Sequence, residues 1–570
     1  MAFAPMSWYR PALLKSLRGG YTKGDFASDL LAGILVGVVS VPLSMGLAIA
    51  SGCKPEQGLY TAIIGGFLIA LLGGSRYQIG GPAGAFVGLC AAGVSQFGYD
   101  GLALATLMSG VIILCFSLFR LGGAISYIPI PVVVGFTTGI AVIIASTQLG
   151  PALGIPSPPK PFAHFHERME YLWLHRGDIA WQPLVVCGAT ALIIIILRRV
   201  SVKIPGALVA LVVVGGVVAL LGWDTNRVVS TIGSEFGDIP HTLPAPHFPS
   251  FGLKEGWTFT DLLGRLRELS GLAFALALLG SIESLLSAVV ADGMSGDRHD
   301  SNTELFGQGI ANVFSPLFFG LPATGVIART STNIRAGARS PFAAMIHALV
   351  VLIIMLALAS MVVHVPMACL AGVLFVVCWS MSEIRHWPHI LHAGRSDAML
   401  LPIAFLMTVM LDLTWAVVVG VLLSMIFFIR RMAETVSIEP ITATNDQEGE
   451  LLAGVPSDVE VYDIRGPFFF GRATLIRDLD SESGTAPKVL ILRMKQVPFI
   501  DATAAFSLRE LISSTHRKGG KLIFCDMTVG GLRDLTQHRL HHDMQPDALS
   551  PDLATALITA RQFLAERAIQ

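Results

Sequence analysis

Residues 121–159 and 340–382 contain no Asp, Glu, Lys or Arg. Because about 20 mostly apolar residues form one helix across a bilayer, each stretch can hold two membrane spans. The whole chain is 53% hydrophobic and only 14% charged, against about 25% charged residues in a typical soluble protein. These features predict an α-helical polytopic membrane protein and exclude a single soluble enzyme.

The charged residues are distributed unevenly. Residues 441–570 contain 31 of them, whereas the first 440 residues contain 48. The C-terminal part therefore has the composition of a soluble domain. We expect a cytoplasmic N-terminal segment at 1–27, a transmembrane transport domain at 28–431, a linker at 432–454 and a soluble domain at 455–570.

Dividing the apolar part at charges, Gly/Pro clusters and polar loops predicts about fourteen spans. Cytoplasmic loops of membrane proteins are enriched in Lys and Arg, and this rule fits when both termini lie in the cytoplasm. The predicted spans are 28–50, 57–74, 82–95, 101–119, 129–149, 182–198, 204–222, 269–291, 303–319, 326–337, 341–363, 366–382, 398–411 and 413–430. The basic residues at their inner ends are Arg76, Arg120, Arg198, Arg199, Lys203, Arg298, Arg335, Arg339, Arg385, Arg395, Arg430 and Arg431.

Several function classes find no support in the sequence. The net charge of −1 gives no basic field for nucleic acid. The seven cysteines have no CxxC spacing, so we identify neither a metal site nor a disulfide framework. Phosphate-binding loops and arrangements typical of catalysis are also missing. We therefore expect neither an enzyme nor a bound cofactor.

Two of the predicted spans, 82–95 and 326–337, are too short to cross a bilayer of about 30 Å. Each follows a glycine- and proline-rich entry, at Gly80–Gly84 and at Gly320–Gly325. Short, interrupted segments at corresponding places in two halves indicate an inverted-repeat transporter whose binding site lies where the broken helices meet. Seven spans per half give the halves opposite orientations. The alternative is a pair of re-entrant loops with only a structural role.

A helix that begins inside the membrane presents unpaired N–H groups and the positive end of its dipole. Two such ends facing each other would bind an anion. The small residues Ala83, Gly84, Gly325 and Ala328 would allow the anion to approach the backbone. Arg329 would add positive charge at membrane depth. The alternative for Arg329 is snorkelling or a structural ion pair.

Glu283 is the other ionisable residue deep within an apolar span, and Ser287 follows one turn later on the same face. A carboxyl group at this depth is expected to bind a coupling ion. A structural ion pair with Arg329 is the alternative. Pro42 is expected to break the first span beside Ser44 and Leu47, which would then line the same cavity.

The tail alternates β-rich runs with helical ones and predicts a small α/β domain. It has no phosphate-binding loop, so regulation or assembly is a better expectation for it than catalysis. Strands are expected at Val459–Ile464, Val489–Arg493 and Leu522–Cys525, and helices near 502–517, 529–537 and 552–566.

Several motifs in order along the chain resemble those of the SulP anion permeases, the family that includes prestin, and the tail resembles a STAS domain. In the first half the motifs are Val41–Ala48, Gly58-Leu59-Tyr60, Gly74-Ser75-Arg76 and Gly80-Gly81-Pro82. In the second half they are Glu283-Ser284-Leu285-Leu286, Ala291-Asp292-Gly293, Asn302 through Glu304, Gln308-Gly309, Asn312, Pro322-Ala323-Thr324-Gly325, Ala328-Arg329-Thr330, Asn333 through Arg335, and Gly337.

The resemblance implies two inverted seven-span repeats, in which a core domain (spans 1–4 and 8–11) moves against a gate domain (spans 5–7 and 12–14). It implies an anion between the N-terminal ends of spans 3 and 10, and a homodimer. The expected substrate-binding residues are Leu47, Ala83, Gly84, Val326, Ile327, Ala328 and Arg329. The expected ion-coupling residues are Glu283 and Ser287.

Two departures from the family pattern affect function. Leu47 and Ala83 stand where prestin-like members have Phe, which argues against a voltage-driven motor. Ala502 stands at the phosphoacceptor position of the related antagonists, between Asp501 and Thr503, and puts that switch in doubt.

We therefore expect a proton-coupled secondary transporter of sulfate, bicarbonate or a dicarboxylate, working by alternating access in the bacterial inner membrane. The alternatives are a sodium-coupled bicarbonate transporter, an anion channel or exchanger, and a membrane-anchored regulatory module. The expected partners are a small anion, membrane lipid, a second copy and a cytoplasmic regulator at the STAS domain, but no nucleic acid.

Overall fold

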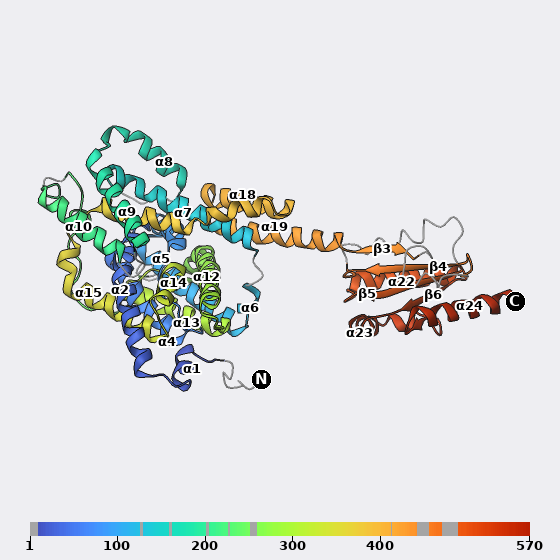
Figure 1. The fold of residues 1–570 in the computed structure, drawn as a ribbon. Coiled ribbons are helices and arrows are strands. Elements are labelled where there is room, and N and C mark those ends of the chain that lie inside the picture. The colour runs from blue at the N-terminus through green and yellow to red at the C-terminus, as the bar shows by residue number, and fades with distance from the viewer. Residues whose placement is uncertain are drawn as a thin grey trace. The chain divides into compact units, whose positions relative to one another are not determined.

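The protein is described here by a computed structural model. The structure describes residues 9–125, 129–158, 162, 164–200, 205–225, 228–250, 259–411, 413–441, 455–469 and 488–569. The chain divides into two compact units, Met1–Val421 and Leu422–Gln570. Each unit is described by itself, and Figure 1 shows their elements.

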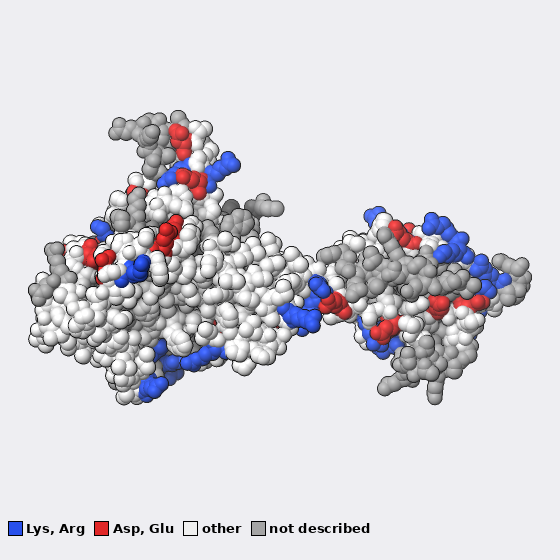
Figure 2. Space-filling view, turned by 90° about the horizontal axis from the view of Figure 1, so that it is seen from above, with Lys and Arg blue, Asp and Glu red and all other residues white. Residues whose placement is uncertain are grey.

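The first unit is almost entirely helical. Eight of its described helices are long and apolar enough to cross a membrane, and Gly206–Leu220 is a shorter apolar helix. Figure 2 shows a broad uncharged surface on this unit. Its helices are α1 (Ala12–Arg18), α2 (Lys23–Ala50), α3 (Pro55–Tyr60), α4 (Gly66–Leu72), α5 (Val87–Leu118), α6 (Gly122–Ile125), α7 (Ile130–Leu153), α8 (Phe165–Leu174), α9 (Trp181–Val200), α10 (Gly206–Leu220), α11 (Ile232–Phe236), α12 (Phe259–Ser295), α13 (Ser301–Phe314), α14 (Ile327–Arg335), α15 (Phe342–Val362), α16 (Met367–Met381), α17 (Trp387–Leu391) and α18 (Arg395–Met410).

The helices of this unit pack in two groups. In the first group, α5 packs against α12 and α13, and α2 packs against α15. In the second group, α7 packs against α16 and α18, and α9 packs against α10 and α16. These groups have the membership that the resemblance implies for the core and gate domains. The expected count of fourteen spans remains a prediction.

Two three-residue strands join the two halves of the sequence. Strand β1 (Gly80–Pro82) pairs antiparallel with β2 (Ala323–Gly325), and Gly81 lies opposite Thr324. Both strands are fully buried. Backbone groups inside a membrane must find hydrogen-bond partners within the protein, and this pairing supplies them where the two interrupted segments leave helical geometry.

The helix boundaries differ from the expectations in two places. The prediction that Pro42 breaks the first span is wrong, because α2 is continuous from Lys23 to Ala50. Neighbouring helices and side chains let membrane helices tolerate proline. The predicted separation of spans 82–95 and 101–119 corresponds to a kink within α5 at Gly98, whose φ of 72° is left-handed.

The second unit is an α/β domain with a five-stranded sheet in the order β3-β4-β5-β6-β7. Helix α19 (Leu413–Glu434) leads into it. The strands are β3 (Ser437–Pro440), β4 (Val459–Arg465), β5 (Val489–Gln496), β6 (Lys521–Cys525) and β7 (Leu549–Ser550), and the helices are α22 (Ala502–Arg517), α23 (Val529–Gln537) and α24 (Leu553–Ile569). The expected α/β architecture is therefore present. Strand β3, which lies in the expected linker, and the short β7 were not predicted.

The sheet of this domain is covered on both faces. Residues of α22 and α23 share one apolar cluster with the strands, including Leu508 and Leu535. Residues of α24, including Leu557, share another. Strands β4 to β7 pair in parallel, and β3 pairs antiparallel with β4 at the edge.

Candidate functional site

Each strand of the β1–β2 pair leads directly into a helix start. After β1 the chain forms the 3-10 turn η2 (Gly84–Phe86) and then α5, and after β2 it forms α14. Neither Ala83 nor Val326, the residues that precede these starts, provides a side-chain cap, and no acidic residue lies in either first turn. A helix start without a cap leaves N–H donors available for an anionic ligand.

Arg329 lies in the first turn of α14 and is only 2% exposed. Its Nη2 donates a hydrogen bond to Ser44 Oγ over 3.1 Å. Its Nε and Nη1 are buried and have no hydrogen-bond partner in the described part of the chain. A Cβ atom placed on Gly81 would lie 2.7 Å from Nη1, so the guanidinium lies directly against β1.

The other expected substrate-binding residues surround these helix starts. Leu47 and Ala83 are buried in one apolar cluster, and Val326 packs against it. Ile327 is half-buried, and Ala328 is exposed, so the surface of α14 is open at this point. Gly84 faces the second helix group: a Cβ there would lie 2.8 Å from Ile144 Cδ1 on α7 and 3.1 Å from Met381 Cε on α16.

The two expected ion-coupling residues lie on α12. Glu283 is half-buried, and its Oε2 is buried without a hydrogen-bond partner. No ion pair joins it to Arg329 among the described residues, so the alternative of a structural ion pair is not found. Ser287 Oγ hydrogen-bonds Thr330 Oγ1 over 3.2 Å, and the Ile79 N–H donates to the same Thr330 oxygen over 3.1 Å. Ser287 therefore connects α12 to α14 and to the segment before β1.

A network of buried hydrogen bonds holds the segment that precedes β1. Gln78 Nε2 donates to Ser284 Oγ over 2.7 Å. Ser284 Oγ contacts Glu304 Oε1 at 3.4 Å. Glu304 Oε2 accepts two backbone N–H groups, from Gly74 and Ser75, each at 2.9 Å. The side chain thus holds the turn that precedes β1.

A second pair of side chains holds β2. Asn312 donates to the Ala323 carbonyl at 2.8 Å and accepts its N–H at 3.0 Å, and Gln308 donates to the same carbonyl. The sequence analysis quoted Glu304, Gln308 and Asn312 only for their resemblance and assigned them no role. Their carboxyl and amide groups could have indicated a structural role, because such groups need hydrogen-bond partners inside a membrane span.

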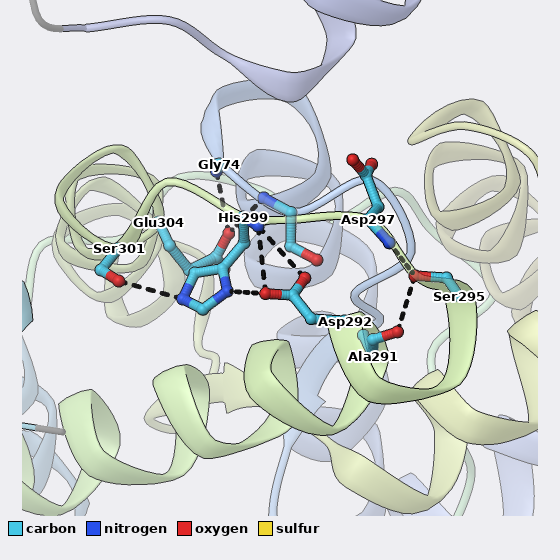
Figure 3. Close-up of polar contacts among 9 residues, drawn as sticks. Gly74, Ala291, Asp292, Ser295, Asp297, His299, Ser301 and Glu304 are labelled. Carbon is cyan, nitrogen blue, oxygen red and sulfur yellow. Dashed lines mark hydrogen bonds and ion pairs between the residues drawn. The ribbon is translucent and has the colours of Figure 1, made fainter.

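The loop between α12 and α13 is held by its own polar contacts, which Figure 3 displays. His299 Nδ1 lies 2.7 Å from Asp292 Oδ2, and its Nε2 lies 3.0 Å from Ser301 Oγ. Asp297 pairs with Arg76 at 3.0 Å. These contacts fix the start of α13 and therefore the position of Glu304.

The arrangement can bind a small anion by backbone dipoles and one guanidinium. One uncapped helix start lies at each end of the strand pair, and two nitrogen atoms of Arg329 have no partner among the described residues. An anion is the ligand that would complete both sets of donors. The nearby aliphatic side chains offer few contacts that depend on the shape of the ligand. The site should therefore select for negative charge more than for one particular anion.

Comparison with known proteins agrees with these observations. A sequence profile described as the sulfate permease family matches residues 26–404, and one described as the STAS domain matches residues 452–556. The Bacillus subtilis (strain 168) protein named "Putative sulfate transporter YvdB" is 41% identical over 92% of this chain and 94% of its own length. The bicarbonate transporter BicA of Picosynechococcus is 29% identical over 92% of each chain.

Solved structures show the same architecture. The chain resembles murine Slc26a9, an anion transporter in the inward-facing state, with a TM-score of 0.84 at 19% identity, covering 96% of this chain and 94% of that one. It also resembles the transmembrane domain of a cyanobacterial BicA, with a TM-score of 0.59 at 26% identity, covering 71% of this chain and 98% of that one. The expected helical transporter fold with a C-terminal STAS domain is confirmed.

Proposed function

This chain belongs to the sulfate permease family, and on that premise we propose that it is a proton-coupled secondary transporter of a small anion such as sulfate, bicarbonate or a dicarboxylate. The single observation that carries the proposal is the buried Arg329 guanidinium, with two unpartnered nitrogens, beside two uncapped helix starts. The relatives named as sulfate and bicarbonate transporters support the substrate class.

The proposed coupling group is Glu283, with Ser287 as its neighbour on α12. Moving a charged carboxylate out of water costs far more free energy than moving a neutral carboxyl group. Whether Glu283 holds a proton therefore depends on whether water reaches its side chain. A conformational cycle that wets and dries this side chain would exchange a proton on each side of the membrane. The movement of the first helix group, which corresponds to the core domain, against the second, which corresponds to the gate domain, would in this way be coupled to the proton gradient.

The proposed location is the bacterial inner membrane, with both termini in the cytoplasm. The basic residues at the inner ends of the predicted spans support this orientation. A homodimer, and a cytoplasmic regulator at the STAS domain, are proposed by family resemblance.

The function is tested with the purified full-length protein in liposomes. Uptake of labelled sulfate, bicarbonate and fumarate is followed with and without an inward proton gradient, with protein-free liposomes as the control. We expect at least one anion to accumulate faster with the gradient. Failure of all three to accumulate would contradict transport. Dependence on sodium in place of protons would favour the sodium-coupled alternative.

The role of Glu283 is tested by Glu283→Gln, which keeps the shape of the side chain and removes its ionisation. We expect uptake that no longer responds to the proton gradient, together with retained anion binding. Glu268→Gln on the same helix is the matched control, because the Glu268 side chain is 52% exposed and pairs with Arg265. Uptake by the unaltered protein that does not depend on pH would contradict the assignment.

A further inference from the structure

A cavity of about 480 Å³, with both apolar and polar lining residues, lies in the first unit, apart from the helix starts that form the candidate site. Helix α8, which contributes to its wall, and helix α1 lie at opposite ends of this unit (Figure 1). Both helix groups contribute to the cavity. Among its lining residues are Ile49, Ala91, Ser146, Gln148, Arg168 and Tyr171.

Arg168 is the cation among the described residues that line this cavity. Its Nη1 donates to Ser146 Oγ over 2.8 Å, and no ion pair of Arg168 is found in the described part of the chain. The adjacent Glu167 instead accepts the backbone N–H of His164 at 3.2 Å and so caps α8. Burial lowers the pKa of Arg168 to about 10, so the guanidinium remains charged at neutral pH.

The cavity and the candidate site use the same three helices, α2, α5 and α7. On α2, Ile49 lies two residues after Leu47. On α5, Ala91 lies seven residues after Gly84, which is about 10 Å along a helix. On α7, Ser146 lies two residues after Ile144, whose Cδ1 would be 2.8 Å from a Cβ on Gly84. Ile144 is fully buried, so its side chain packs between α7 and the helix start at Gly84.

We propose that this cavity is a second anion site, an outer vestibule in which Arg168 attracts the transported oxyanion before Ile144 moves aside. The inference rests on the proposed function, and in the proposed orientation the vestibule faces away from the cytoplasm. Ser146, which accepts the hydrogen bond of Arg168, and Gln148 are polar residues of the lining, and Glu235 is the carboxylate among the lining residues. A single charge beside water attracts ions and speeds their entry without holding them tightly.

The test measures initial uptake by intact cells that produce the full-length protein, with labelled sulfate or bicarbonate added outside. For Arg168→Ala we expect KM to rise about three- to tenfold with kcat nearly unchanged. Added potassium gluconate should then raise KM less than it does for the unaltered protein, because the charge that salt screens is gone. Arg176→Ala is the matched control, since Arg176 lies in the same segment but is exposed and contacts Trp173.

Two further variants separate the charge of Arg168 from its hydrogen bond to Ser146. Arg168→Lys keeps the charge, so its KM should stay within about twofold of the original value. Ser146→Ala removes the bond but leaves the charge, so its KM should also stay near the original. An Arg168→Ala variant with unchanged KM, or a Ser146→Ala variant that reproduces its defect, would overturn the vestibule. Absence of uptake by the unaltered protein would instead contradict the proposed function.

Discussion

At the scale of single residues, the candidate site depends on a charge that the protein itself leaves largely unsatisfied. Arg329 has one described hydrogen bond, to Ser44, while its other two guanidinium nitrogens are buried without partners. A buried donor without an acceptor is costly. The cost is recovered when a bound anion accepts these donors, so the same atoms favour binding and penalise the empty site.

We predict that Arg329→Ala weakens anion binding by about 1.5–3 kcal/mol, the range for hydrogen bonds to charged groups, or roughly ten- to hundredfold in Kd. Arg329→Lys should bind with intermediate strength, since it keeps the charge but loses the planar fork. Isothermal titration with the transported anion measures both. Arg335→Ala at the exposed end of the same helix is the control, and equal losses in Arg329→Ala and Arg335→Ala would contradict the assignment.

We predict that Gly325→Ala destabilises the protein, because the added Cβ would lie 1.9 Å from Gln78 Nε2. Overpacking of this kind costs about 1–3 kcal/mol. The second variant Gln78→Ala makes room for the methyl group, so the double variant should recover part of the lost stability. Thermal unfolding in detergent, followed by tryptophan fluorescence, measures the three proteins. Additive effects of the two substitutions would contradict the close contact.

The sequence identified the charged residues of the site better than their surroundings. Arg329 and Glu283 stand out because ionisable residues are rare in apolar spans. Ala83 was expected at the site because it is small, and Leu47 because it follows Pro42, whereas the family resemblance placed both at substrate-contacting positions. The contacts of Gln78 with Ser284 and of Ser287 with Thr330 join segments far apart in the chain. An amide or hydroxyl group can accept many partners, so sequence alone does not select one.

At the scale of elements, glycine acts in two different ways in the first unit. Gly58 on α3 lies so close to α2 that a Cβ would be 2.0 Å from the Ser44 carbonyl oxygen. Gly98 in α5 has open space around it but a φ of +72°. The first position is limited by packing between helices, and the second by the local backbone.

We predict that Gly58→Ala costs more stability than Gly98→Ala. The first substitution requires a shift of two packed helices, at about 3 kcal/mol or more. The second adds the backbone strain of a φ of 72° with a ψ of 178°, a combination that is essentially restricted to glycine, at about 1–3 kcal/mol. Melting temperatures of the two full-length variants in detergent compare these costs. A larger loss in Gly98→Ala would indicate that the α2–α3 contact adapts easily.

The elements were predicted where periodicity was strong and missed where tertiary contacts decide. Strands β4, β5 and β6 and helices α22 and α23 lie close to their expected positions, because apolar runs and helical spacing mark them. Strand β3 was missed because Ser437–Pro440 is short and ends in proline. Its extended conformation depends on pairing with β4, a contact that the local sequence does not reveal. Pro42 was misread because neighbouring helices, which the sequence does not display, support the helix around it.

At the scale of the whole molecule, the soluble unit begins earlier than its composition indicates. Strand β3 pairs with β4 from Ser437↔Arg465 to Pro440↔Tyr462. Ile438 of β3 packs against the apolar cluster on the α22 face. A division of the chain at residue 455 therefore separates one strand of the sheet from the other four.

We predict that a fragment of residues 435–570 is more stable than a fragment of residues 455–570, by about 1–3 kcal/mol, because the shorter one loses several β3–β4 hydrogen bonds of about 1 kcal/mol each. Urea unfolding followed by circular dichroism measures both. Glu439→Gln in the longer fragment is the control, since its ion pair with Arg465 is half exposed and contributes little. Equal midpoints for the two fragments would contradict a contribution from β3.

The bare helix starts at Ala83 and Val326 also have a consequence for handling the protein. A ligand that binds only the folded state raises the free energy of unfolding, by about 2.7 kcal/mol at a concentration of 100 times Kd. In the proposed binding mode the transported anion is such a ligand, because unfolding separates the two helix starts. Washing the purified protein free of anions therefore shortens its lifetime in detergent, and a panel of buffer salts ranked by melting temperature becomes a substrate screen that needs no transport assay.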